Sequence, residues 1–447
     1  MSSNSSAEPS LAPRRGPVAP APTAASAETM RALAMVPLVV YAVLTQLDAV
    51  ANRLSGGSPI GTTELTLAAL LGMTALIFIA PGDEPAPARA YGNTGARLIA
   101  LMFCWAVVSW TLSAHQSEGL SYLSKLFVAI LPALCTLIIA DRPSRIRLLL
   151  WAIIAAGAVS AAIIVIESRT GTRLVSTSIA ATTAGFEGVA RSAGGSDQNP
   201  TTAAQMLLVS VALAAALLFS GERRFRLVYA GVVALGALAL VLGSARSAII
   251  GLAVAFALIA LSFRGKPYFP LLIIGGLVAC VGAIPFLPPT LLERFTAVTD
   301  FGRDQTLYRR ISYLRIGFDL LQQSPIWGVG PGNFPLHYLL PDYRWMPGRE
   351  LYPRELHNTY LDAAVEYGLV GFLAFAAALG YALLAAWRAM GSRDPLLARC
   401  AFAVGVALLA LMAACFFMPH KNLRYLWLVV AIAVQCGRLR AAEKVSP

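Results

Sequence analysis

Long apolar runs limit what this chain can fold into. Twelve runs of roughly 18 to 25 residues, each the length that a helix needs to cross about 30 Å of hydrocarbon, begin near residues 31, 62, 97, 119, 145, 202, 225, 246, 268, 361, 398 and 422. The chain has 447 residues, of which 57% are hydrophobic and 13% charged, whereas about a quarter of the residues in a soluble domain are charged. The sequence therefore predicts an all-α polytopic membrane protein with about twelve transmembrane helices.

The spacing of these runs divides the chain into four regions. Residues 1–29 are rich in Ala, Pro and Ser and are predicted to form a disordered tail. Residues 30–287 hold spans one to nine, with a long loop at 168–201. Residues 288–360 are expected to form a helical loop domain, and residues 361–447 hold spans ten to twelve and a short tail.

Basic residues mark one side of the predicted membrane domain. The net charge is +12, but the distribution of charge is more informative than its sum, and no nucleic-acid partner is expected. Lys and Arg recur in alternate loops, in the groups Arg89 and Arg97, Arg142 to Arg147, Arg223 to Arg226, Arg264 and Lys266, Arg388 to Arg399, and Arg438 to Lys444. By the positive-inside rule both termini lie in the cytoplasm, and both long loops lie on the opposite side.

The second long loop contains an amphipathic segment, QTLYRRISYLRIGFDLLQQSP. Its apolar residues follow helical spacing and predict one buried stripe, formed by Leu307, Ile311, Leu314, Phe318 and Leu321. On that helix Arg310 lies beside the stripe and Arg309 points to water. The helix should end near Pro325. The glycines of GVGPGNF then predict a tight turn, which resembles a dinucleotide-binding fingerprint but lacks its βαβ context.

Three further positions reach the same side of the membrane as Arg310. Arg191 lies in VARSAGGSDQNP, Arg246 in GSARS at the end of the eighth span, and His357 at the start of HNTYLDAAVEYG. Each has a simpler interpretation, because loop arginines pair with nearby carboxylates and interfacial arginines reach for lipid headgroups. Their convergence on one face is the stronger signal.

These four motifs resemble those of the O-antigen ligase and polymerase superfamily of bacterial envelope glycosyltransferases. The resemblance covers about the last two-thirds of the chain and departs from the relatives' pattern at Leu314, where many of them carry Trp. It implies a GT-C-like fold in the bacterial inner membrane, with a large periplasmic loop domain between spans nine and ten. The implied substrates are undecaprenyl-diphosphate-linked O-antigen and lipid A-core, both set among membrane lipids, and the active site faces the periplasm.

The implied reaction needs a bound diphosphate and stabilisation of the charge that develops as it leaves. The non-cytoplasmic loops contain no DxD motif that could hold a divalent metal. Guanidinium groups stay charged and bind phosphate oxygens in pairs, so we assign Arg191, Arg246 and Arg310 to the diphosphate. The enzyme is then expected to need no metal or cofactor, and activity that is lost in chelator and restored by magnesium would contradict this.

His357 is the expected catalytic base, since a helix N-terminus and nearby arginines favour its neutral form. Thr359 and Asp362 have the spacing of a capping box that would begin the tenth span. Asp362 and Glu366 share a helix face and could orient His357, bind the acceptor sugar or simply join helices. Asn358 and Asn333 are further candidates for supporting roles.

The acceptor hydroxyl would attack the anomeric carbon directly, which predicts inversion of configuration. A polymerase that uses the same donor is the alternative within the family. A secondary transporter is the alternative from another class, but it predicts inverted repeats and ionisable groups near mid-bilayer, and neither pattern occurs in this sequence.

Overall fold

The protein is a bundle of α-helices in this computed structural model, which describes residues 24–56, 61–79, 93–175, 191–267, 269–271, 273–274, 305–346, 348 and 352–443. The α-helices are α1 (Ala24–Leu54), α2 (Thr62–Ile79), α4 (Thr94–Thr111), α5 (Gln116–Ile139), α6 (Pro143–Thr170), α8 (Pro200–Ser220), α9 (Arg226–Leu242), α10 (Arg246–Ser262), α13 (Gln305–Gln323), α14 (Phe334–Tyr338), α15 (Thr359–Ala389), α16 (Pro395–Ala414) and α17 (Arg424–Ala442). Three short 3₁₀ helices join them, η1 (Arg223–Phe225), η3 (Pro341–Tyr343) and η4 (Cys415–Phe417).

Ten of the described helices are long and apolar enough to cross a membrane, and α10 is a shorter apolar helix of 17 residues. The predicted all-α polytopic fold is confirmed. The predicted ninth span, near residue 268, lies largely outside the described residues, so the count of twelve stays a prediction. Most of the predicted tail also lies outside them, although α1 begins at Ala24, within that segment.

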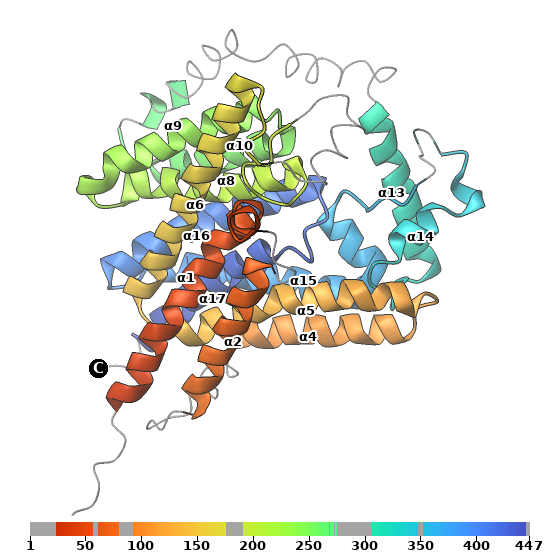
Figure 1. Ribbon diagram of the computed structural model, residues 1–447, viewed down its shortest axis with the longest axis horizontal. Helices are drawn as coiled ribbons and strands as arrows, with labels where there is room; N and C mark the ends of the chain where they lie inside the picture. The colour runs from red at the N-terminus through yellow and green to blue at the C-terminus, as the bar shows by residue number, and fades with distance from the viewer. Residues whose placement is uncertain are drawn as a thin grey trace, which may run out of the picture.

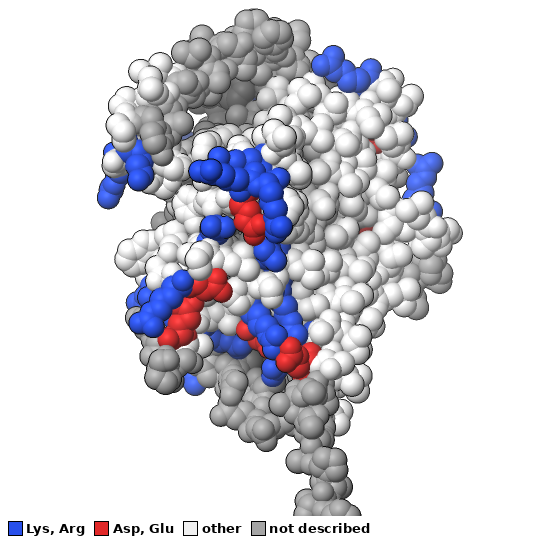
Figure 2. All heavy atoms as spheres, turned by 90° about the vertical axis from the view of Figure 1, so that its left-hand side faces the viewer, with Lys and Arg blue, Asp and Glu red and all other residues white. Residues whose placement is uncertain are grey.

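One face of the molecule carries groups of charged side chains. In Figure 1 the C-terminus lies at the left and the loop helices α13 and α14 lie at the right. Figure 2 shows Lys and Arg gathered together with carboxylates on the left-hand face. Two such pairs join Arg142 with Glu28 at 2.7 Å and Arg147 with Glu222 at 3.1 Å. This grouping matches the alternate basic loops of the sequence.

Helix α8 forms the centre of the bundle. It contacts α16, α9, α10 and α6. Of its most apolar stretch of 18 residues, 89% are buried, as expected for a helix that is apolar on all sides. Its polar groups are satisfied by neighbouring helices: Gln46 of α1 donates to Ser210 at 3.0 Å and to the hydroxyl of Tyr425 in α17 at 2.8 Å. These bonds fix the depth of α8 relative to α1 and α17.

Helix α13 packs through a different face from the one predicted. Its buried residues include Tyr313, Ile316 and Leu320, whereas Leu314 and Phe318 are 39% and 55% exposed. The predicted stripe is wrong for Leu314 and Phe318, while Ile311 and Leu321 are half-buried, because apolar side chains at a membrane surface can face lipid as well as the protein interior. Periodicity alone therefore did not identify the protein-facing side.

Helix α15 is broken at Gly368, where the backbone adopts φ 67° and ψ 179°. The segment after α13 docks into this break: the N–H groups of Val329 and Gly330 donate to the carbonyls of Val365 and Glu366 at 2.9 and 3.0 Å. Three glycines of this segment, Gly328, Gly330 and Gly332, have positive φ, which confirms the predicted tight turn. Gly368 thus allows the backbone of this loop to approach the helix closely.

Helix α1 is interrupted in a similar way at Leu47, which has φ −127° and ψ 26°. The carbonyl of Gly195 accepts the N–H groups of Ala49 and Val50 at 3.1 and 3.2 Å. Asp48 accepts the N–H of Asp197 at 2.8 Å. Each of the two long loops thus supplies backbone partners to a broken helix.

We predict that Gly368→Ala destabilises the protein by about 2 kcal/mol or more, because positive φ strains an L-residue. An added Cβ would also overlap the backbone of Ile326. Gly380→Ala is the matched control, since Gly380 lies in the same helix with no atom within 4 Å of an added Cβ. Thermal unfolding in detergent should show a clearly lower midpoint for the first variant only; equal midpoints would contradict the account of the break.

Candidate functional site

A cavity of about 830 Å³ opens among α1, α2, α5, α8, α15 and the α16–α17 loop. This volume falls within the range of small-molecule sites. The side chains that line the cavity include His357, Asp362 and Glu366 from the predicted site. Arg191, Arg246, Arg310, Asn333 and Asn358 are not among the lining residues.

His357 lies at the edge of this cavity, immediately before α15. Its ring stacks on Tyr313 of α13, with centroids 5.2 Å apart and an interplanar angle of 16°. Its Nδ1 lies 2.8 Å from the carbonyl oxygen of Glu355. A carbonyl can only accept, so Nδ1 carries the proton and the lone pair is on Nε2.

Positive charges surround His357. Burial, with smaller contributions from the charges of Arg310, Arg354 and Arg309, lowers the pKa of His357 to about 4. The arginines act in the predicted direction, but burial is the larger cause. Arg309 was expected to face water, yet it is half-buried like Arg310. The rotated packing face of α13 brings both guanidinium groups toward this side.

Arg310 also reaches the α16–α17 loop, because its Cζ lies 5.5 Å from the ring centroid of Phe417. In the same loop the N–H of His420 donates to Thr359 Oγ1 at 2.9 Å, and His420 Nε2 is hydrogen-bonded to Gln205 of α8. This loop therefore joins the beginnings of α8 and α15, beside Arg310.

Arg191 and Arg246 lie at the N-terminal ends of α8 and α10. Arg191 is buried, and its Nη2 donates to Thr201 Oγ1 at 3.2 Å. Arg246 begins α10 and precedes Ser247, whose hydroxyl accepts from Gln205 at 2.7 Å. The structure thus places the predicted residues around one group of helix ends, with the arginines outside the cavity wall and His357 on it.

The N-terminus of α15 is capped differently from the prediction. Asn358 is the N-cap, and its side-chain oxygen accepts the N–H groups of Tyr360 and Leu361 at 3.0 and 3.1 Å. The proposed capping box of Thr359 and Asp362 does not form. The Thr359 hydroxyl donates to the Met418 carbonyl at 2.6 Å, and a neighbouring lysine binds the carboxylate of Asp362. Asparagine is among the best N-cap residues, so the cap falls one residue earlier.

The lysine that binds Asp362 is Lys421, and the same Nζ lies 2.7 Å from Glu366 Oε2. All three side chains are at least 95% buried. Glu366 Oε2 also accepts the N–H of Gly332 at 2.6 Å. Burial disfavours the ammonium ion, but the two carboxylates outweigh this effect and raise the pKa of Lys421. The three charges connect α15, the α16–α17 loop and the loop after α13.

The sequence predicted no role for His420 or Lys421. Both line the cavity. The signal that could have found them is a His-Lys pair directly after Pro419, in a short loop predicted to lie on the same side as His357. Asn333 lies in the loop-domain core, where its Nδ2 donates to the Val329 carbonyl at 2.9 Å. It supports the turn and does not contact the cavity.

A potential metal site can be judged only for the residues that the structure describes. Among them, no group of three or more His, Cys, Asp or Glu side chains is placed to hold a metal ion.

Comparison with protein families gives one match. Residues 231–376, about a third of the chain, match the family model described as O-antigen ligase. The matched segment includes Arg246, Arg310 and His357 and leaves out Arg191. The resemblance predicted from the sequence is confirmed at the level of the O-antigen ligase and polymerase superfamily, without a distinction between its branches. Comparison with curated proteins gave no match.

We predict that Lys421→Met destabilises the protein by roughly 3–5 kcal/mol, because it leaves two buried carboxylates without their cation. Adding Asp362→Asn and Glu366→Gln should restore most of the loss. Lys125→Met is the control, since Lys125 also lines the cavity but is exposed. Unfolding midpoints of the purified variants test this. A single Lys421 variant as stable as the control would contradict the stabilising role of the ion pairs between Lys421, Asp362 and Glu366.

Proposed function

We propose that this chain acts within the O-antigen ligase and polymerase superfamily as a ligase. In this proposal it moves O-antigen polysaccharide from undecaprenyl diphosphate to a sugar hydroxyl of lipid A-core, in the periplasmic leaflet of the inner membrane. The family match and the ten apolar helices support the coarser statement. They indicate a multi-pass inner-membrane protein of lipopolysaccharide biosynthesis with a glycosyltransferase activity of the ligase or polymerase kind and a lipid-linked O-antigen substrate.

The observation that carries the mechanism is the state of His357. Its Nδ1 proton is held by the Glu355 carbonyl, and its ring is neutral at physiological pH. Nε2 is thus prepared to take the proton of the acceptor hydroxyl. The hydroxyl oxygen attacks the anomeric carbon while the bond from that carbon to the diphosphate oxygen breaks, so the configuration is inverted.

We assign Arg191, Arg246 and Arg310 to stabilise the negative charge on the diphosphate as it leaves. Fixed guanidinium groups meet this charge without a metal ion. Bound diphosphate beside Arg310 offsets the positive field on His357 and raises its pKa, which makes the ring a better base in the complex than in the free protein.

The chain's length and the large loop predicted between spans nine and ten look more like the ligase branch than the protein-glycosylating branch, whose members are usually longer. These features do not separate a ligase from a polymerase, because those two branches share the chemistry and the gross topology. An experiment on the cell-surface glycan separates them.

Deletion of a ligase should leave lipid A-core without O-antigen while long lipid-linked polymer accumulates. Deletion of a polymerase should instead leave core capped by a single repeat unit. We predict that His357→Ala reproduces the ligase deletion at normal protein level, with transfer reduced by about 10² to 10⁴-fold. His337→Ala is the control, because His337 does not line the cavity. Full transfer by the His357 variant would refute the base assignment.

The pKa of His357 predicts an unusual pH dependence. A base whose pKa is about 4 stays neutral from pH 8 to pH 5.5, so kcat/KM should be nearly constant there and fall only as pH drops toward 4. A histidine of ordinary pKa would lose about tenfold at pH 5.5. The acid limb of kcat should lie at higher pH than that of kcat/KM, because the bound diphosphate raises the pKa. A tenfold fall in kcat/KM by pH 5.5, with the fold intact, would contradict the prediction.

A further inference from the structure

The charges that line the cavity do not suit a diphosphate. Four cationic side chains line it, together with six carboxylates: Asp48, Glu64, Asp197, Glu355, Asp362 and Glu366. Two of the cations are already paired, Lys421 with two carboxylates and Arg424 with Glu64 at 3.3 Å. The cavity therefore presents more hydrogen-bond acceptors than cations, which suits hydroxyl groups better than a diphosphate.

One side of the cavity concentrates this acceptor character. The acidic wall, as we name it, consists of Asp48 and Asn52 of α1, Thr63 and Glu64 of α2, and Asp197 of the loop before α8. Local bonds fix its shape: Asp48 Oδ1 accepts the N–H groups of Ala49 and Asp197 at 3.0 and 2.8 Å, and Asn52 Oδ1 accepts the N–H and the hydroxyl of Thr62, both at 3.1 Å. The break in α1 thus gives the wall a fixed geometry.

Thr63 supplies independent evidence that a ligand belongs here. Its side chain lines the cavity and the residue is only 3% exposed, yet its hydroxyl finds no hydrogen-bond partner among the residues that the structure describes. On the α16–α17 loop, the buried Oδ1 of Asn422 also lines the cavity and likewise has no donor among those residues. A buried polar atom without a partner is costly. A ligand with hydroxyl groups can accept a hydrogen bond from the Thr63 hydroxyl and donate one to Asn422 Oδ1.

We propose that the acidic wall binds the hydroxyl groups of the acceptor saccharide and presents one of them to His357. This inference rests on the proposed function and names the subsite that the function leaves open. Sugar hydroxyls donate to the carboxylates of Asp48 and Glu64 and exchange hydrogen bonds with the Thr63 hydroxyl. His357 then lies between two substrates, with the acceptor in the cavity on one side and the diphosphate at Arg191, Arg246 and Arg310 on the other.

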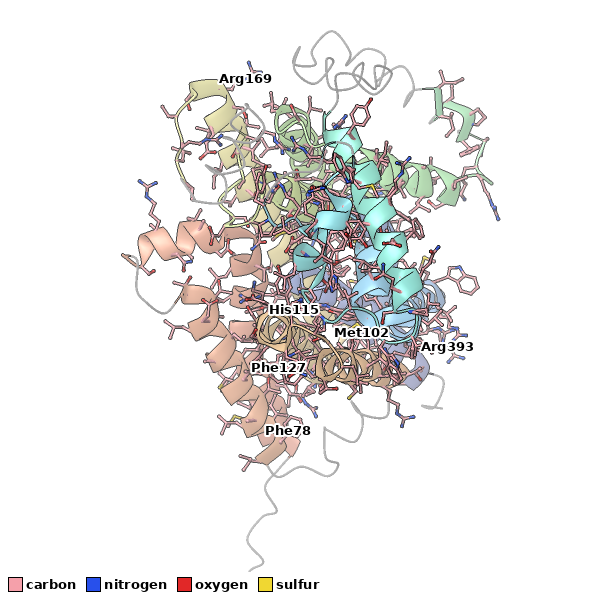
Figure 3. The ribbon with its side chains drawn as sticks, turned by 90° about the vertical axis from the view of Figure 1, so that its right-hand side faces the viewer. Phe78, Met102, His115, Phe127, Arg169 and Arg393 are labelled. Atoms are coloured by element: carbon pink, nitrogen blue, oxygen red, sulfur yellow. The ribbon has the colours of Figure 1, made fainter. Side chains whose placement is uncertain are left out.

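The position of the arginines favours the acceptor over the donor glycan as the occupant. Arg191, Arg246 and Arg310, which we assign to the diphosphate, do not line the cavity, whereas His357 does. A base must contact the acceptor hydroxyl on the face of the anomeric carbon opposite the leaving group, so the acceptor approaches from the cavity. Figure 3 looks onto this end of the molecule, with α13 crossing the front and His115 at the tip of the α4–α5 hairpin.

The decisive variant is Thr63→Val, which removes the hydroxyl and keeps the shape of the side chain. We expect the KM for rough lipopolysaccharide, which is lipid A-core without O-antigen, to rise roughly tenfold. The KM for the lipid-linked donor should stay unchanged, and the unfolding midpoint should not fall. Asp48→Asn should act in the same way, because it keeps the oxygen that accepts the backbone N–H groups and removes the charge.

Thr74→Val is the matched control: Thr74 is buried in the same helix, its hydroxyl donates to the Leu70 carbonyl at 2.7 Å, and it does not line the cavity. A rise in donor KM in the Thr63 variant, or no change in either KM, would overturn the proposal.

A binding experiment separates a failure of the acidic-wall proposal from a failure of the proposed ligase function. It measures binding of rough lipopolysaccharide to the purified protein without donor. Weaker binding by the Thr63 variant supports the wall even if the wild type transfers nothing, whereas wild-type protein that binds no rough lipopolysaccharide overturns it.

Discussion

Backbone groups that lose their helical partners inside a membrane protein must find new ones within the protein, and the break in α15 at Gly368 depends on this constraint. The loop after α13 supplies the missing partners, while the side chains of Trp105 and Ser109 in α4 donate to the carbonyls of Tyr367 and Glu366 at 2.8 and 2.7 Å. The loop domain is therefore held on α15 by main-chain bonds as well as by apolar contacts. His357 lies about ten residues before the break, so its position depends on how the loop docks there.

Each of the two long loops hydrogen-bonds to the backbone of a broken helix. One fills the break in α15, and the other fills the break in α1 through Gly195. In both places a glycine of positive φ allows the loop backbone to approach a helix closely. The broken helices also carry polar side chains of the cavity, since Asp48 follows the break in α1 directly and Asp362 lies in the first turn of α15.

The proposed reaction depends on the separation of two kinds of polar surface. Guanidinium groups gather at the ends of α8, α10 and α13, and carboxylates dominate the cavity beyond His357. A diphosphate and a polyhydroxyl sugar differ in charge, so this separation gives each substrate its own side of the base. Lys421 keeps two of the cavity's carboxylates, Asp362 and Glu366, buried without leaving them unpaired.

The sequence by itself determined the all-α membrane fold, the alternate basic loops and the glycine turn, because hydropathy, charge and positive φ are local properties. It also singled out His357 and the four arginine- and histidine-bearing motifs. Only the tertiary structure decided which face of α13 is buried, that Asn358 caps α15, that Lys421 and His420 enter the site, and that the arginines lie outside the cavity. The cap is a local contact, but the other features depend on contacts between segments as far apart as Asp362 and Lys421, and no local pattern records which distant charge will neutralise a buried carboxylate.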